Sequence, residues 1–234
     1  LYDLGYLDEI YIGPVRSVRP YFLSVAKSYD ATVLHVGGSP ESLDLISEGY
    51  VDSLNEFGRG NYFWRSKKRW APHNVMTSDV LIKEADEKFD FDLPTFDPLS
   101  YEDIEVQKFM SPSYVFGELA IDWRYEAQSQ LYTRYQSNKP FVDDDGEITA
   151  SNVVIMYAPM TILDNELRRG IGMIGEGDVD VYRAGGHIEG TWSRSSDDEI
   201  TRFFDADGEE IKFVRGVTWV SVLPPGWSIE RLTL

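Results

Sequence analysis

Two arginines stand three positions apart near the start of the chain. Residues 13–21 read Gly-Pro-Val-Arg-Ser-Val-Arg-Pro-Tyr, which predicts a turn that leads into a helix. A helix N-terminus offers free N–H groups and a guanidinium presents a fork of donors, so Arg16, Ser17 and Arg19 could hold a carboxylate or a phosphate. The structural alternative is that both arginines pair with some of the 40 acidic residues and hold the turn.

A second polar group follows an apolar run. Residues 30–40 read Asp-Ala-Thr-Val-Leu-His-Val-Gly-Gly-Ser-Pro, which predicts a buried strand, a glycine turn and a helix capped by Ser39. Ligands of open α/β sheets bind beyond the carboxyl ends of strands, so His35 could act there as a base or a hydrogen-bond donor, and Ser39 is a further candidate binding residue. The alternative is a core histidine with internal partners. Ser39 does not fit the Gly-x-Ser-x-Gly nucleophile motif, because Glu41 replaces its second glycine.

The third group lies in a basic stretch. Residues 59–73 contain Arg59, Arg65, Lys67, Lys68 and Arg69, no acid, and several aromatic residues. Arg-Trp-Ala-Pro-His-Asn-Val-Met-Thr-Ser follows over residues 69–78 and adds more polar groups before a predicted helix. The candidate binding residues of this segment are Arg69, His73, Asn74 and Ser78. Cations interleaved with aromatic rings could hold a sugar, an anionic polymer or a peptide, and the alternative is an ordinary exposed basic loop.

Several kinds of chemistry find no support in the sequence. The chain has no cysteine, and its three histidines show no metal-binding spacing, so we predict no metal site and no cofactor. The acidic turns at residues 143–147 and 205–208 lack the twelve-residue pattern of a calcium loop. The glycine-rich residues 170–177 lack the lysine and hydroxyl residue of a phosphate-binding loop.

The charge of the chain limits its partners. The 234 residues include 22 Lys and Arg against 40 Asp and Glu, a formal net charge of −18. Long-range repulsion therefore opposes general binding to DNA, RNA or anionic lipid. The first residues lack both an initiator Met and the pattern of a signal peptide, so we expect the sequence to be a piece of a longer precursor.

The secondary structure predicted around these groups changes along the chain, from mixed helices and strands to mostly strands. Helical spacing or caps predict helices over residues 19–28, 40–48 and 78–87, and an apolar run predicts a strand over 31–36. Further strands are predicted at 115–123, 151–157 and 218–223, with a hairpin that joins 203–204 to 211–214. We therefore predict an α+β protein, in which an N-terminal α/β domain precedes a mostly antiparallel β domain.

The predicted boundaries follow a change in composition. Residues 84–105 hold nine acids and one lysine, so we expect a segment of little regular structure that crosses between domains. The predicted division is residues 1–92 for the α/β domain, 93–106 for an acidic linker and 107–234 for the β domain.

The three N-terminal motifs, taken in order, resemble the YerB-type bacterial lipoproteins, a family built from a domain of unknown function. The resemblance spans roughly residues 12–225 and continues in Tyr132-Thr133-Arg134, residues 150–154, the glycine series 170–177 and residues 216–219. It implies a two-domain protein outside the cell, anchored to the cell membrane through a lipidated N-terminal cysteine. No cysteine is present, so such an anchor would lie outside this sequence. The resemblance implies no activity.

Two functional hypotheses follow. The first is a non-catalytic envelope protein that binds an anionic wall polymer, a glycan or another envelope protein. The second is a metal-independent hydrolase or transferase that acts on a wall component, with His35 or His73 as base and both N-terminal arginines on an anionic group. We favour the first, because the sequence shows no set of nucleophile, base and orienting residue. Under either hypothesis we expect Arg16, Arg19, His35 and the 69–78 loop to lie on one face.

The basic stretch leaves one further alternative open. Its cations could pair with acidic residues of the C-terminal half, for example those at 197–210. They could instead stay free for an anionic partner.

Overall fold

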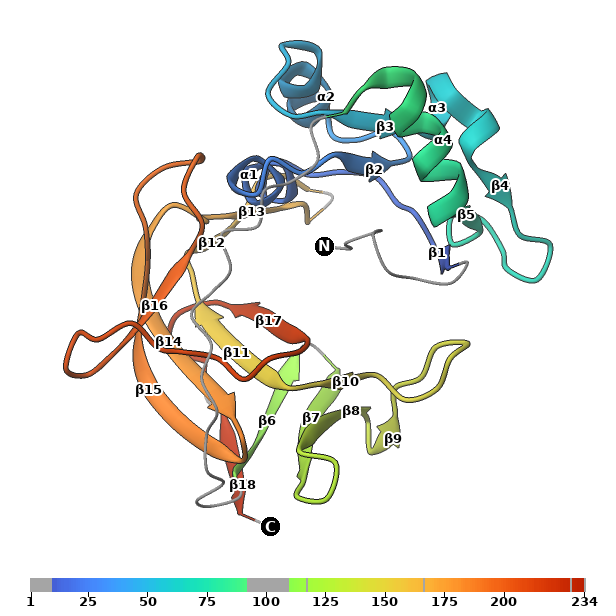
Figure 1. The fold of residues 1–234 in the computed structure, drawn as a ribbon. Helices are drawn as coiled ribbons and strands as arrows, with labels where there is room; N and C mark the ends of the chain where they lie inside the picture. Colours follow the sequence, from blue (N-terminus) through green and yellow to red (C-terminus); the bar gives the residue numbers. More distant parts are fainter. Residues whose placement is uncertain (1–9, 92–109, 117, 166, 228, 234) are drawn as a thin grey trace. The chain divides into compact units, whose positions relative to one another are not determined.

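The computed structural model describes residues 10–91, 110–116, 118–165, 167–227 and 229–233 (Figure 1). The chain divides into two compact units. The first unit comprises Leu1–Phe96 with Ser196–Ile200, and the second comprises Asp97–Ser195 with Thr201–Leu234. Among the described residues no helix is long and apolar enough to cross a membrane.

The first unit combines short helices with two small sheets. Its helices are α1 (Pro20–Ser28), α2 (Pro40–Ser47), α3 (Glu56–Arg59), the 3-10 helix η1 (Gly60–Tyr62) and α4 (Asp79–Phe89). One sheet pairs β2 (Val33–His35) in parallel with β3 (Ser53–Asn55). The other is antiparallel and has the order β1 (Tyr11–Ile12), β5 (Val75–Ser78), β4 (Trp64–Arg65). The unit is thus the α/β part that the sequence predicts.

The helices begin where local sequence signals place them. The Ser39 hydroxyl accepts a hydrogen bond from the Ser42 N–H at the start of α2, and Pro40 occupies the first helical turn. The Ser78 hydroxyl accepts from the Leu81 N–H at the start of α4. Because such caps act within one helical turn, the sequence places both helix starts.

The second unit is built from two large sheets. The first has the order β10 (Thr149–Ala150), β8 (Leu131–Gln136), β7 (Leu119–Glu126), β6 (Met110–Phe116) and β18 (Glu230–Thr233), with β9 (Lys139–Pro140) beside β8. The second has the order β16 (Arg202–Asp205), β15 (Gly186–Arg194), β14 (Gly175–Arg183), β11 (Asn152–Tyr157) and β17 (Thr218–Leu223). A two-stranded ribbon joins β12 (Met160–Ile162) to β13 (Arg169–Ile171). The described strand pairs of the second unit are antiparallel, except that β11 and β17 run parallel.

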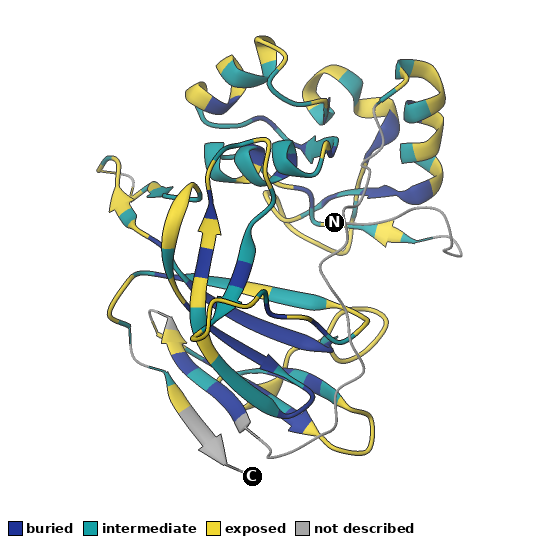
Figure 2. Cartoon of the chain, turned by 60° about the vertical axis from the view of Figure 1, so that its left-hand side comes forward, coloured by how far each residue is buried: buried dark blue, intermediate teal, exposed yellow. Residues whose placement is uncertain are grey.

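The two large sheets pack face to face. Trp123 and Tyr132 of the first sheet share a buried cluster with Ile155 and Tyr182 of the second. The other face of the second sheet buries its own cluster around Trp192 and Phe213. Strand β11 contributes to both clusters and its residues are mostly buried (Figure 2), which explains its apolar run from Val153 to Tyr157.

The structure corrects two sequence predictions. The strand predicted over residues 115–123 is two antiparallel strands, since β6 ends at Phe116 and β7 begins at Leu119. The glycine at position 117 was the overlooked signal of a break. The acidic segment 84–105 starts as regular structure, because α4 continues to Phe89. The predicted linker 93–106 lies outside the described residues.

The hairpin predicted around residues 205–208 has its turn but only one regular strand. Strand β16 ends at Asp205, whose carboxylate accepts from the N–H groups of Asp207 and Glu209. The returning chain bridges Phe204 to Glu210, and the Ile211 N–H donates to the Phe203 carbonyl (2.8 Å), but residues 211–214 form no strand. The side-chain hydrogen bonds of Asp205 therefore hold the turn, although the second strand of the predicted hairpin does not form.

Candidate functional site

The segment 15–18 connects the two sheets of the first unit. The Val15 N–H donates to the carbonyl of Val75 (2.8 Å), at the start of β5. On the other side, the Val36 N–H donates to the carbonyl of Arg16 (3.0 Å). The segment thus brings the N-terminal arginines between the loop before β5 and the turn before α2.

Arg16 meets His73 across 57 positions of sequence. Its Nη1 lies 2.6 Å from His73 Nδ1, and both side chains are exposed. A guanidinium only donates, so the ring nitrogen that receives this hydrogen bond carries no proton. Among the described residues no carboxylate forms an ion pair with Arg16, so its charge is available to an anion at this surface.

Arg19 has a different environment. Its Nη1 donates to the Ser17 hydroxyl (3.0 Å) and to the Val18 carbonyl (2.8 Å), directly before α1. These contacts close a local turn. The structure therefore groups Arg16 with His73 and Arg19 with Ser17, and the meeting of all the candidates on one face remains a prediction.

His35 is a buried residue, with 1% of its surface exposed. Its Nδ1 lies 2.9 Å from the carbonyl of Gly37, so Nδ1 carries the proton and donates. Nε2 is buried and has no hydrogen-bond partner among the described residues. Burial lowers the pKa of His35, and the bond to Gly37 opposes this effect in part. His35 is therefore held neutral, out of reach of a ligand on the surface.

The loop between β4 and β5 carries the exposed part of the basic stretch. We call residues 66–74 the basic loop. Its base is closed by the Ser66 N–H, which donates to the Asn74 carbonyl (2.7 Å), and the His73 N–H donates to the Trp70 carbonyl (2.9 Å). Trp70 is 91% exposed. The loop therefore presents an aromatic ring to solvent from a hydrogen-bonded frame.

The five cations of the basic stretch fall into two groups. Arg59 stacks on the ring of Phe89 (3.6 Å), and Arg65 pairs with Glu56 (3.0 Å). Lys67, Lys68 and Arg69 are exposed, and no carboxylate among the described residues pairs with them. Only this second group is free to bind an external anion.

The acidic residues at 197 and 198 contact a helix. The Ser24 hydroxyl donates to the Asp197 carboxylate (2.5 Å), and Lys27 pairs with Asp198 (3.7 Å). Both partners lie in α1. These two acids are therefore engaged away from the basic loop.

The remaining candidates support the backbone. Ser39 and Ser78 cap helices, and Ser78 is buried. The Asn74 side chain accepts from Arg65 Nη1 at 3.4 Å. These contacts account for the three residues structurally, and any role of theirs in binding remains a prediction.

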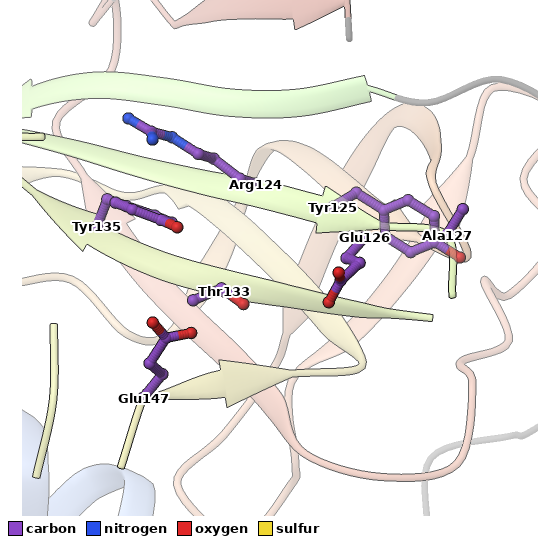
Figure 3. A pocket seen from close by; sticks show the side chains of 7 residues that line it. All are labelled: Arg124, Tyr125, Glu126, Ala127, Thr133, Tyr135 and Glu147. Carbon is purple, nitrogen blue, oxygen red and sulfur yellow. The ribbon is translucent and has the colours of Figure 1, made fainter. Parts of the chain in front are cut away.

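An open hollow lies on the first sheet of the second unit, and none of the predicted candidates lines it. Its volume is about 490 Å³ and it is lined by Arg124, Tyr125, Glu126, Ala127, Thr133, Tyr135 and Glu147. Figure 3 shows the carboxylates of Glu126 and Glu147 on either side of Thr133. The hollow offers hydroxyl and carboxylate groups to a polar ligand. Strand register places part of the lining, because Arg124 and Thr133 are paired positions of β7 and β8.

Sequence reasoning also missed a buried network in the second unit. His187 Nε2 lies 2.6 Å from Asp180 Oδ1, and the Tyr157 hydroxyl donates to Asp180 Oδ2 (2.9 Å). The Glu189 carboxylate lies within 4.8 Å of the same donor atoms, a set that could hold a cation. Both Asp180 oxygens already have protein partners, so the network is satisfied by hydrogen bonds. The only sequence signal near this network was the glycine-containing turn between β14 and β15. In the structure both φ angles at residues 184–185 of that turn are positive (46° and 76°).

The chain is similar to proteins without an established activity. Residues 7–92 match the N-terminal domain model, and residues 113–220 the C-terminal domain model, of a protein of unknown function, DUF3048. The "Putative lipoprotein YerB" of Bacillus subtilis (strain 168) is 27% identical over 226 residues, which cover 91% of this chain and 67% of that protein. The crystal structure of YerB protein from Bacillus subtilis matches with a TM-score of 0.83 and 26% identity, over 94% of this chain and 77% of that one.

Proposed function

This chain belongs to the DUF3048 family of proteins of unknown function, and we propose that it is an extracytoplasmic, membrane-anchored protein that binds an anionic polymer of the cell envelope without chemically altering it. The location is supported by the name of its Bacillus relative, which describes a lipoprotein. The binding is supported by the basic loop.

One observation carries the proposal. Lys67, Lys68 and Arg69 are exposed without ion-pair partners in the described part of a chain whose net charge is −18. An exposed ion pair is worth at most about 1 kcal/mol, so stability alone gives little reason to gather these cations. A polyanion that contacts several cations at once releases its counterions, and this release makes the free energy of binding more favourable. The exposed ring of Trp70 adds an apolar surface against which a sugar ring can pack.

The arrangement of the two histidines favours binding over catalysis. Among the described residues neither His35 nor His73 is hydrogen-bonded to a hydroxyl or a carboxylate, as a base paired with a nucleophile or an orienting acid would be. His35 faces the Gly37 carbonyl from a buried position, and His73 contacts a guanidinium. Nothing in this geometry activates a nucleophile.

The test is retention of the full chain on purified anionic wall polymer at low salt. The variant changes Lys67, Lys68 and Arg69 together to Gln and leaves Arg65 intact, because Arg65 is paired with Glu56. The control changes Lys88 and Lys139 to Gln, two exposed lysines of other elements that form no ion pair among the described residues. We expect weak binding by the wild type and the control, and a loss of roughly tenfold or more in affinity for the loop variant.

Salt gives a second readout of the same interaction. The logarithm of the binding constant should fall with the logarithm of the salt concentration, with a slope that is less steep by about 2 to 3 in the loop variant. Equal retention and equal slopes for the wild type and the loop variant would refute the proposal. The basic loop would then be an ordinary solvated surface.

A further inference from the structure

Arg134 is a buried cation without a carboxylate partner. It extends from β8 and has 8% of its surface exposed. Its only polar side-chain partner among the described residues is Gln136, whose Oε1 lies 3.4 Å from both Nη1 and Nη2. The Nε atom is buried and has no acceptor. Both contacts to Gln136 are at the long limit of a hydrogen bond, so most of the donor capacity of this guanidinium is unused.

Aromatic rings surround the guanidinium. Its Cζ lies 4.1 Å from the centroid of the Phe141 ring and 5.5 Å from that of Trp219. Beside them, the hydroxyls of Tyr114 and Ser221 are hydrogen-bonded to each other (2.7 Å). The rings attract the cation, but they do not neutralise it. Burial lowers the pKa of Arg134, yet an arginine stays charged in a protein.

A second arginine shows what Arg134 lacks. Arg124 lies on the neighbouring strand β7 and also stacks on a ring, with its Cζ 3.8 Å from the Tyr135 centroid. Arg124 is more exposed, pairs with Asp122 (3.3 Å) and donates to Asn138 (2.6 Å). Arg134 carries the same charge in a drier place without such a carboxylate. A buried, unpaired charge is destabilising, so its retention calls for a counter-charge.

We propose that Arg134 binds an oxyanion, either a carboxylate or a phosphate, on a ligand whose flat body packs against Phe141 and Trp219. A guanidinium donates two parallel hydrogen bonds to either anion. An anion would replace Gln136, whose contacts are long, next to Phe141, which is 39% exposed. This site lies in the second unit and is independent of the basic loop.

The experiment titrates the full chain with inorganic phosphate and, separately, with sodium glucuronate, at constant ionic strength maintained with NaCl. Intrinsic fluorescence reports binding, because Trp219 is next to the guanidinium. We expect a saturable change in the wild type and in the control Arg168→Gln, an ion-paired arginine of the second unit, and no saturable change in Arg134→Met. The two titrants distinguish a phosphate ligand from a carboxylate ligand.

Two further readouts separate binding from a structural role. Without anion, Arg134→Met should unfold at the wild-type temperature or above it, because an apolar chain replaces an unpaired charge. Arg134→Lys keeps the charge but loses the fork, so it should fold and bind at least tenfold more weakly. No response of the wild type to either anion, or an unchanged response in Arg134→Lys, would overturn the proposal. The basic-loop variant should keep the full response, whatever its behaviour on wall polymer.

Discussion

His35 and His73, the two histidines of the first unit, differ in exposure and in partner. His35 is buried, and its Nδ1 donates to the carbonyl of Gly37, whereas His73 is exposed and accepts from Arg16. Arg134 and Arg124 also differ, since only the less buried Arg124 has a carboxylate partner among the described residues. At the residue scale, burial and partner therefore decide the chemistry of a side chain more than its type does.

The first prediction concerns the dependence of stability on pH. The pKa of His35 is lowered in the folded state, so the stability that its neutral form contributes is present above the unfolded pKa of about 6.5 and is lost as the pH falls towards the folded pKa. His35→Asn keeps a donor for Gly37 but does not titrate. Between pH 7.5 and 5.0 the wild type should therefore lose more unfolding free energy than the variant, by up to about 1.4 kcal/mol per unit of pKa depression.

Urea denaturation at the two pH values measures this difference. Parallel losses in His35→Asn and the wild type would show that His35 titrates equally in the folded and unfolded chains.

The close approach of neighbouring strands limits which positions of the second sheet can carry a side chain. Gly190 in β15 pairs with Asp205 in β16, and a Cβ placed on Gly190 would lie 2.0 Å from the carbonyl oxygen of Phe204. Gly186, in the same strand, would place its Cβ 3.4 Å from the nearest atom, the carbonyl oxygen of Arg183. The edge pairing of the second sheet thus depends on a missing side chain at one position and tolerates one at the other.

The second prediction tests this contrast. Gly190→Ala must displace backbone of β16 and should lower the free energy of unfolding by about 3 kcal/mol. Gly186→Ala, the matched control, meets only ordinary contacts and should change it by less than about 1 kcal/mol. Guanidinium chloride denaturation of the full chain measures both values, and similar losses in the two variants would contradict the strand register described here.

An excess of negative charge governs the molecule as a whole. The net charge is −18, while the free cations of the basic loop occupy one short stretch of the first unit. Self-repulsion of a highly charged chain destabilises the compact state, and salt screens that repulsion. The same salt weakens the binding of a polyanion to the basic loop. Stability and binding should therefore respond to ionic strength in opposite directions.

The third prediction is a rise in the thermal midpoint of unfolding between about 20 and 500 mM NaCl, where the Debye length falls from roughly 20 to 4 Å. Differential scanning calorimetry measures it. The basic-loop variant is three charges more negative and should show a larger rise. A midpoint that falls with salt in the wild type would mean that attractive ion pairs outweigh the repulsion.

Features that depend only on neighbouring residues could be predicted from the amino-acid sequence. The helix starts at Ser39 and Ser78 follow from caps within one turn, and the strands at 152–157 and 218–223 follow from short apolar runs. The α+β fold class and the family resemblance rest on such local signals. The basic character of residues 59–69 could also be read from the sequence, although the exposure of each cation could not.

Only the tertiary structure decided which distant residues meet. It placed Arg16 against His73, paired β11 with β17 in parallel, and left Arg134 without a carboxylate among the described residues. Strand pairing and packing through space produce these contacts, and a single sequence has no periodicity that encodes the partner of a residue dozens of positions away. For the same reason the sequence could identify the charges of this protein but could not tell which of them are paired.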